Sequence, residues 1–183
     1  VFAKMADTQT PQGILTVLEQ PVYDLTQLLQ QPDPLFLMLE NLQDPGNLGT
    51  MIRTGEGAGI TGVIMNNQTV DIFNPKTIRA TMGSIFRVPF VYVPELSTVL
   101  TQMHERGIHT YAAHLKGQKY YDSFSFREPT AFLIGNEGNG LSKEISDQAG
   151  QYLKIPMEGR VESLNASIAA ALLMYEAHRQ RNL

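Results

Sequence analysis

The sequence predicts an α/β fold with a mostly parallel sheet flanked by helices. Short apolar runs typical of buried strands alternate along the chain with segments whose apolar residues recur every three or four positions. Such alternation is typical of parallel strands joined by crossover helices. The chain has 183 residues, 43% hydrophobic and 17% charged, which is enough for one domain with a real core.

Residues 1–30 are expected to be the end of an upstream domain and a linker, and residues 31–183 a single domain. Thr10-Pro11-Gln12-Gly13 is a turn signal, and the segment from Gln27 to Pro34 is rich in Gln and Pro and is interpreted as a linker. In the first part of the larger domain, the expected strands are 35–39, 62–65 and 89–93, and the expected helices are 48–58, 75–86 and 95–106.

The second part of the chain continues the alternation. Strands are expected at 108–113, 130–134 and 152–155, and helices at 142–148 and 163–181, with a polar irregular segment at 116–128. The middle of the last helix, from Ala166 to Tyr175, has almost no polar face, and a helix that is apolar all round is buried all round. We expect either a central core helix in a monomer or a helix covered on one side by a second subunit.

The composition excludes several classes of site. The chain has no cysteine, so disulfides and thiolate chemistry are excluded, and its four histidines show no metal-ligand spacing. We expect no metal and no membrane span, since no apolar run approaches about 20 residues, and a cytoplasmic location because no signal peptide is evident. The net charge of −4 argues against a non-specific nucleic-acid coat.

A glycine-rich turn follows the apolar run Ala131–Ile134. Glycines stand at 135, 138 and 140, with one carboxylate, Glu137, between them, and Ser142 begins a helix. A turn of this kind after a buried strand allows backbone N–H groups to approach a ligand closely. The alternative is an ordinary strand–turn–helix connection.

Two further groups of residues indicate chemistry. Asp44-Pro45-Gly46-Asn47 is a turn after a strand, where Asn47 can cap the next helix, and Arg53 lies on that helix with Gly49 and Gly57 on the same ridge. This arrangement leaves room for a large ligand against an arginine that suits phosphate, unless Asn47 is only a cap and Arg53 a surface residue.

The third group lies near the end of the chain. Ile155-Pro156-Met157 ends a strand, and Ser163-Leu164-Asn165 opens the last helix. Ser163 is predicted to be the N-cap of that helix, with Asn165 in its first turn.

These three blocks, in this order and spacing, resemble the TrmH/SpoU branch of the SPOUT RNA methyltransferases over about residues 35–181. The resemblance implies a C-terminal trefoil knot, a homodimer and methyl transfer from S-adenosylmethionine to a ribose 2′-hydroxyl of RNA, with ribosomal RNA favoured over transfer RNA. It also implies that residues 1–30 end an upstream RNA-binding domain.

The resemblance also implies which residues form the site. The catalytic residues would be Asn47, Arg53, Glu137, Ser163 and Asn165, and the cofactor-binding residues Gly135, Asn136, Gly138, Ile155, Met157 and Leu164. Arg53 would clamp the RNA phosphate and stabilise the developing alkoxide, since a guanidinium does not release its proton near neutrality. Two alternatives remain open, a knotted RNA-binding module without catalysis and a base methyltransferase of the same superfamily.

Overall fold

The computed structural model describes residues 10, 13–161 and 163–183, and its centre is a seven-stranded sheet. The strands are β1 (Leu35–Leu39), β2 (Gly62–Asn66), β3 (Phe90–Val93), β4 (His109–Ala113), β5 (Lys119–Tyr120), β6 (Thr130–Ile134) and β7 (Gln151–Lys154). They lie in the order β3-β2-β1-β6-β4-β7-β5, and every pairing is parallel. The predicted fold class is confirmed, and the C-terminal knot stays a prediction.

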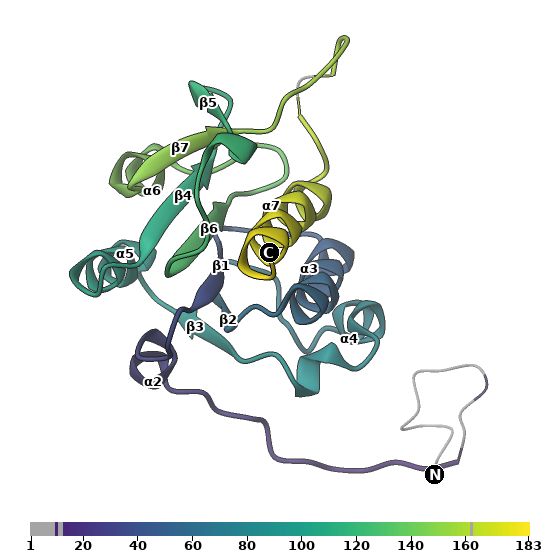
Figure 1. Ribbon diagram of the computed structural model, residues 1–183. Helices are drawn as coiled ribbons and strands as arrows, with labels where there is room; N and C mark the ends of the chain where they lie inside the picture. The colour runs from purple at the N-terminus through teal and green to yellow at the C-terminus, as the bar shows by residue number, and fades with distance from the viewer. Residues whose placement is uncertain (1–9, 11–12, 162) are drawn as a thin grey trace.

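Helices cover both faces of the sheet (Figure 1). The helices are α2 (Leu25–Leu29), α3 (Pro45–Ala58), α4 (Pro75–Thr81), α5 (Leu96–Glu105), α6 (Lys143–Gln148) and α7 (Ala166–Arg181), with 3₁₀ turns η1 (Ser84–Phe86) and η2 (Tyr121–Ser123). The buried residues of α3 and α7 form one core with one face of the sheet, and those of α2, α5 and α6 form a second core with the other face. The result is a three-layer α/β/α arrangement.

The central strands explain why the apolar runs were recognisable as strands. All five residues of β1 and all five of β6 are buried. A parallel strand with helices on both faces has no solvent side, so its sequence is continuously apolar rather than alternating. β1 and β6 pair in register from Leu35 opposite Thr130 to Leu39 opposite Ile134, so both strands end at the same level.

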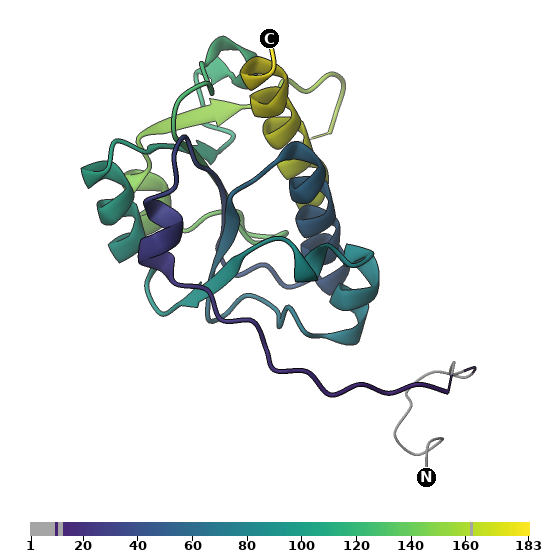
Figure 2. The same ribbon diagram turned by 60° about the horizontal axis from the view of Figure 1, so that its bottom comes forward.

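The segment before β1 differs from the prediction. The predicted linker Gln27–Pro34 overlaps a short helix, α2, whose first turn is capped by the Asp24 carboxylate and whose Leu28 and Leu29 are buried. The cap and two core leucines outweigh the composition of the segment. Residues 13–22 form no helix or strand and extend away from the sheet (Figure 2). Of the predicted N-terminal region, residues 1–9, 11 and 12 lie outside the described residues.

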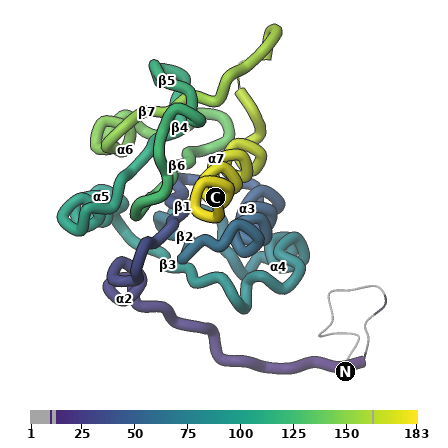
Figure 3. Tube along the Cα trace, viewed as in Figure 1, coloured from purple at the N-terminus to yellow at the C-terminus, as the bar shows by residue number. Residues whose placement is uncertain are grey.

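The predicted helix 75–86 is also divided. α4 ends at Thr81, because Met82 takes a left-handed φ of 50°, and the chain continues as η1. α7 begins at Ala166 rather than at Ser163, and the loop from 155 to 161 runs out past the sheet before the chain returns to it (Figure 3).

The C-terminal end of α7 is attached to the sheet by one arginine. The Arg181 guanidinium donates to four backbone carbonyls, those of Asp33, Pro34, Phe126 and Glu128. These carbonyls precede β1 and β6, so Arg181 joins the last helix to the starts of the two central strands. Burial lowers the pKa of Arg181.

Replacing Arg181 with Ala is expected to lower the free energy of unfolding by about 2 kcal/mol or more, because four charge-assisted hydrogen bonds are lost, one of them to the carbonyl of the buried residue Phe126. Denaturant unfolding would measure the change. The control is Arg179→Ala, which removes an ion pair on the same helix in which the Arg179 side chain is 58% exposed. Its partner Glu176 keeps the hydrogen bond from the Gln180 amide, so this change should cost less than about 1 kcal/mol. Equal effects of the two substitutions would contradict this account of Arg181.

Candidate active site

A cavity of about 370 Å³ opens at the carboxyl ends of the central strands. α3, which follows β1, packs on one face of the sheet, and α6, which follows β6, packs on the other. The chain therefore leaves these two neighbouring strands in opposite directions, and the crevice between such connections is the usual ligand site of an open α/β sheet. The cavity is lined by residues 113–115, 134–141, 153–155, 157, 163, 164, 166 and 169.

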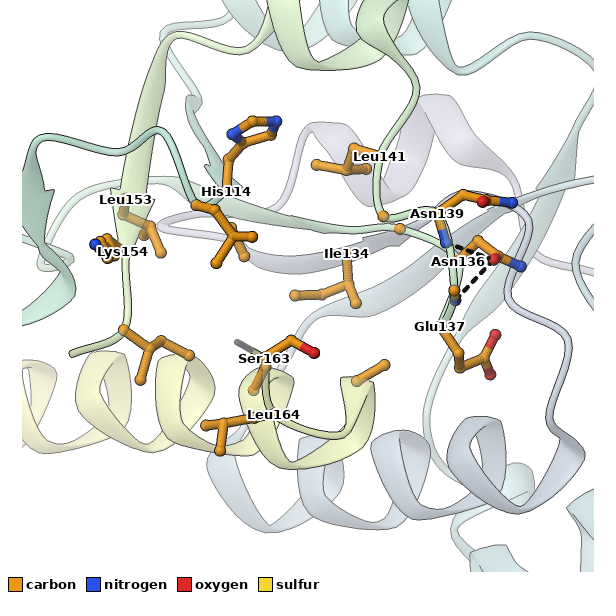
Figure 4. A pocket seen from close by; sticks show the side chains of 18 of the residues that line it. His114, Ile134, Asn136, Glu137, Asn139, Leu141, Leu153, Lys154, Ser163 and Leu164 are labelled. Carbon is orange, nitrogen blue, oxygen red and sulfur yellow. Dashed lines mark hydrogen bonds between the residues drawn. The ribbon is translucent and has the colours of Figure 1, made fainter. Parts of the chain in front are cut away.

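The glycine-rich turn after β6 forms one wall of the cavity. Asn136 and Gly140 exchange two backbone hydrogen bonds of 3.0 and 2.8 Å, and Gly140 has a φ of 68°. The Asn136 side-chain oxygen accepts hydrogen bonds from the N–H groups of Gly138 and Asn139 (Figure 4). A Cβ on Gly135 would lie far inside van der Waals contact with the backbone of Gly140 and Leu141. The turn therefore folds tightly onto itself and presents backbone atoms to the cavity.

Glu137 holds the beginning of α3. Its Oε1 accepts from the N–H of Asp44 at 2.9 Å and its Oε2 from the N–H of Gln43 at 3.0 Å. Oε1 also accepts from the Asn47 amide at 3.1 Å. Figure 4 shows Glu137 at the opposite end of the cavity from Leu153 and Lys154. A carboxylate at a helix N-terminus is favoured by the helix dipole and by the free N–H groups there.

The charge state of Glu137 follows from these contacts. Burial alone would raise its pKa. The hydrogen bonds that the carboxylate accepts have the opposite effect and together outweigh burial, so the pKa lies below the usual value for a glutamate. Glu137 is therefore ionised at neutral pH. A carboxylate with both oxygens already engaged and a lowered pKa is poorly suited to take up a proton.

Asn47 and Asn165 continue the same chain of hydrogen bonds. The Asn47 oxygen accepts from the Asn165 amide at 3.0 Å. The Asn165 oxygen in turn accepts from the N–H and hydroxyl of Ser167, so Asn165 is the N-cap of α7. The chain of contacts runs from α7 through α3 to the glycine-rich turn. It brings together residues from three sequence blocks that are up to 118 positions apart.

The structure corrects the expected cap of the last helix. Ser163 was expected to cap it, but Asn165 does so, and Ser163 lies two residues earlier on the wall of the cavity. Both types of side chain are good N-caps, so the pattern alone did not decide between them.

Arg53 lies apart from the hydrogen-bonded cluster. It is exposed on α3, six positions after Asn47, and in the described part of the chain it has no hydrogen bond or ion pair. The space for a large ligand that was expected beside Arg53 is partly filled by neighbouring helices. A Cβ on Gly49 would lie 2.6 Å from the carbonyl oxygen of Thr77 on α4, and one on Gly57 would lie 2.9 Å from the Tyr175 hydroxyl on α7. These glycines allow helix packing rather than ligand binding.

The remaining predicted residues line the cavity. Gly135, Asn136 and Gly138 belong to the glycine-rich turn, Ile155 and Met157 to the loop after β7, and Leu164 to the approach to α7. A third wall, the loop after β4 with Ala113, His114 and Leu115, was not expected from the sequence. His114 stacks on Tyr152 with ring centroids 5.0 Å apart. The signal that could have found this loop is the turn at Lys116-Gly117, directly after a predicted parallel strand.

Among residues 10, 13–161 and 163–183, no three His, Asp or Glu side chains gather as a metal ion would require. In the same part of the chain, no helix is long and apolar enough to cross a membrane.

Comparison with known proteins gives the family. Residues 34–175 match the model of the SpoU rRNA Methylase family. The chain belongs to the SpoU rRNA Methylase family. The resemblance inferred from the three sequence blocks is thereby confirmed. A relative from Bacillus subtilis, the 23S rRNA (guanosine(2553)-2′-O)-methyltransferase RlmP, is 35% identical over 174 residues, which are 95% of this chain and 68% of that protein.

Solved SpoU structures have the same architecture. The SpoU methyltransferase AviRb from Streptomyces viridochromogenes, in complex with the cofactor AdoMet, is 34% identical, with a TM-score of 0.82 over 88% of this chain and 63% of that one. A tRNA/rRNA methyltransferase of Synechocystis sp., described as uncharacterized, is 35% identical over 99% of this chain and 65% of its own length. The chain thus spans about two thirds of the length of the Bacillus, Synechocystis and Streptomyces proteins.

Proposed function

We propose that this chain is the catalytic part of an enzyme that transfers a methyl group from S-adenosylmethionine to a ribose 2′-hydroxyl of RNA. The observation that carries the proposal is the hydrogen-bonded series Asn165, Asn47 and Glu137, which reaches the cavity at Glu137, a residue of the glycine-rich turn that lines it. Family membership, the 2′-O-methyltransferase name of the Bacillus relative and the AdoMet complex of AviRb support it.

The cavity suits the cofactor. Its volume of about 370 Å³ is within the range of small-molecule sites, and its lining combines apolar side chains with a few polar groups. Backbone atoms of Gly135, Ile155 and Leu164 would contact the cofactor, with Met157 beside them. Asn136 and Gly138 would shape the turn on the same wall. When bound, S-adenosylmethionine supplies a methyl group already activated on a sulfonium sulfur.

The protein then has to place the ribose hydroxyl and stabilise its developing negative charge. Glu137 and Asn165 fix the Asn47 side chain from its two ends, so we assign Glu137 a positioning role rather than that of a base. Asn47, Ser163 and Asn165 would orient the ribose, and Arg53 would neutralise charge on the RNA phosphate and the forming alkoxide. The proton would leave through the phosphate or water.

Cofactor binding by this chain alone tests the proposal. Calorimetry should detect S-adenosylmethionine binding, and an excess of a metal chelator should leave the affinity unchanged. Absence of heat at about millimolar cofactor, which corresponds to less than about 4 kcal/mol of binding free energy, would count against the proposal.

The protein is further proposed to act as a homodimer through α7. The helix buries Ala170, Leu173 and Met174 in its own chain but leaves Ile168, Leu172 and Tyr175 between 37% and 50% exposed. Of the two expectations for this helix, a central core helix in a monomer is therefore wrong, since one side of its middle is exposed in the single chain. The three exposed residues follow the helical repeat, so they form one apolar stripe, and a second copy of this chain would cover it.

Leu172→Glu is expected to convert the dimer to monomers, because it places a charge in the apolar stripe. Sedimentation at about micromolar protein concentration would measure the change. Leu173 is unsuitable for this test, since it is fully buried within its own chain. Val22→Glu is the control, since Val22 is 93% exposed and lies before α2. A wild-type monomer under the same conditions would overturn the proposed dimer.

The substrate is proposed to be ribosomal RNA, which agrees with the family description and with the 23S rRNA named for the Bacillus relative. Such a substrate implies a cytoplasmic location. Transfer RNA is the alternative, since another relative is named for both RNA classes.

A further inference from the structure

The turn directly after β1 holds the glycine-rich turn at both ends. Glu40, only 7% exposed, accepts a hydrogen bond from the N–H of Ser142 at 2.7 Å. The next residue, Asn41, accepts one from the Asn136 side-chain amide through its backbone carbonyl at 2.9 Å. The N–H of Glu40 donates to the carbonyl of Ile134 at 3.0 Å. The residues that begin and end the glycine-rich turn are thus bound to two consecutive residues of another segment.

These hydrogen bonds matter because the turn has little packing of its own. Residues 137–140 are all exposed, so no buried side chain fixes their position. A loop with few buried contacts keeps a single shape only where hydrogen bonds determine it. Glu40 and Asn41 are therefore well placed to determine the shape of this wall of the cavity.

Asn41 is held in an uncommon conformation. Its φ is 54°, in the left-handed region that costs a non-glycine residue about 1 kcal/mol or more. Asn66, at the end of β2, stabilises this conformation with two hydrogen bonds. Its oxygen accepts from the Asn41 N–H at 3.0 Å, and its amide donates to the Asn41 side-chain oxygen at 2.8 Å. The Thr69 hydroxyl also donates to the Asn66 oxygen at 2.8 Å.

We propose that Glu40 and Asn41 are positioning residues that hold the glycine-rich turn in the shape that accepts the cofactor. Neither residue is among those lining the cavity, so both act through Ser142 and Asn136. The inference rests on the proposed function for the identity of the ligand. The hydrogen bonds themselves can be tested in the free protein.

The experiment compares two pairs of substitutions. Glu40→Ala removes the acceptor of the Ser142 N–H, whereas Glu40→Gln keeps an amide oxygen that can accept the same bond. Asn41→Ala leaves a non-glycine residue in the left-handed region without its side-chain partner. Asn41→Gly adopts the same φ without strain and keeps the carbonyl that binds Asn136.

Two quantities are measured for each variant. The first is the dissociation constant for S-adenosylmethionine by calorimetry, and the second is the amide hydrogen-exchange rate of Ser142 in the free protein. Both Ala variants should bind the cofactor at least about tenfold more weakly, while Glu40→Gln and Asn41→Gly should stay within about threefold of the wild type. The exchange rate of Ser142 should rise in Glu40→Ala and stay near the wild-type value in Glu40→Gln.

The control is Gln180→Ala. Gln180 also joins separate segments, since it accepts from the Phe126 N–H at 2.7 Å and donates to the Phe124 carbonyl, but it lies on α7 away from the cavity. This variant should lose stability and keep its cofactor affinity, which separates a general loss of stability from positioning.

The outcomes distinguish this inference from the proposed function. Wild-type cofactor affinity in both Ala variants overturns the positioning role, as does an unchanged Ser142 exchange rate in Glu40→Ala. If the wild type binds no S-adenosylmethionine, the proposed function fails, and the Ser142 exchange rate alone then decides whether Glu40 holds the turn. If Glu40→Ala does not fold, the two Asn41 variants decide through their cofactor affinities.

Discussion

Replacing Arg53 with Ala is expected to reduce methyl transfer to RNA by about a hundredfold or more and to leave the affinity for S-adenosylmethionine nearly unchanged. A preorganised charge that stabilises a transition state contributes about 3 kcal/mol, which corresponds to this factor in rate. Arg53 is exposed on α3 and is not among the residues that line the cavity, so it should contribute little to cofactor binding. Single-turnover rates and calorimetry on the full-length protein would measure the two quantities.

Two further variants make the test of Arg53 specific. Arg53→Lys should recover only part of the rate, because an ammonium lacks the planar fork that contacts phosphate at two points. Arg127→Ala removes another exposed arginine and should keep wild-type turnover. Arg127 lies just before the amino end of β6, whereas the cavity opens at the carboxyl ends of the strands. If Arg53→Ala retains near-normal turnover, Arg53 is a surface residue and the proposed mechanism is wrong.

Gly135→Ala is expected to weaken cofactor binding by at least about tenfold, or about 1.4 kcal/mol. The added methyl group would overlap the backbone of Gly140 and Leu141, which cannot move away without breaking the two hydrogen bonds between Asn136 and Gly140. Overpacking of this kind should also lower the free energy of unfolding by about 1–3 kcal/mol. Calorimetry and denaturant unfolding would measure the two effects.

A second glycine of the same turn provides the control. A Cβ on Gly138 would meet only the Asn136 side-chain oxygen, at 3.5 Å, an ordinary contact distance. Gly138→Ala should therefore keep the fold of the turn and change the free energy of unfolding by no more than about 0.5 kcal/mol. If the two substitutions have the same effect, the close approach at Gly135 is not what shapes the cavity.

The elements predicted best are those whose pattern of apolar residues reflects their burial. β1 and β6 were recognised because all their residues are buried, and the amphipathic face of α3 marked that helix. α2 was missed because five residues give too short a pattern, and its two buried leucines sit within a Gln/Pro-rich stretch. Local composition was a weaker guide there than the tertiary contacts of Leu28 and Leu29.

The sequence blocks indicated residues that the structure brings together at the cavity, apart from Arg53, but they did not indicate how these residues contact one another. The sequence blocks indicated Asn47, Glu137 and Asn165, yet nothing in their spacing shows that they bond to one another in series. The hydrogen bonds of Glu40 and Asn41 were not predictable, since they join the turn after β1 to the turn after β6, which is about 100 positions away in the sequence. Likewise, no local pattern in α7 indicates which side of an apolar helix faces outward.

Mapping of 2′-O-methylation in cells tests whether the protein transfers methyl groups to a ribose 2′-hydroxyl of RNA. Total RNA from cells with and without the gene would be compared by mass spectrometry of nuclease fragments, with the Arg53→Ala gene as a third sample. We expect one 2′-O-methylated nucleotide, in ribosomal RNA, to be lost without the gene and not restored by Arg53→Ala. Loss of a base methylation, or no change in any RNA, would contradict the account.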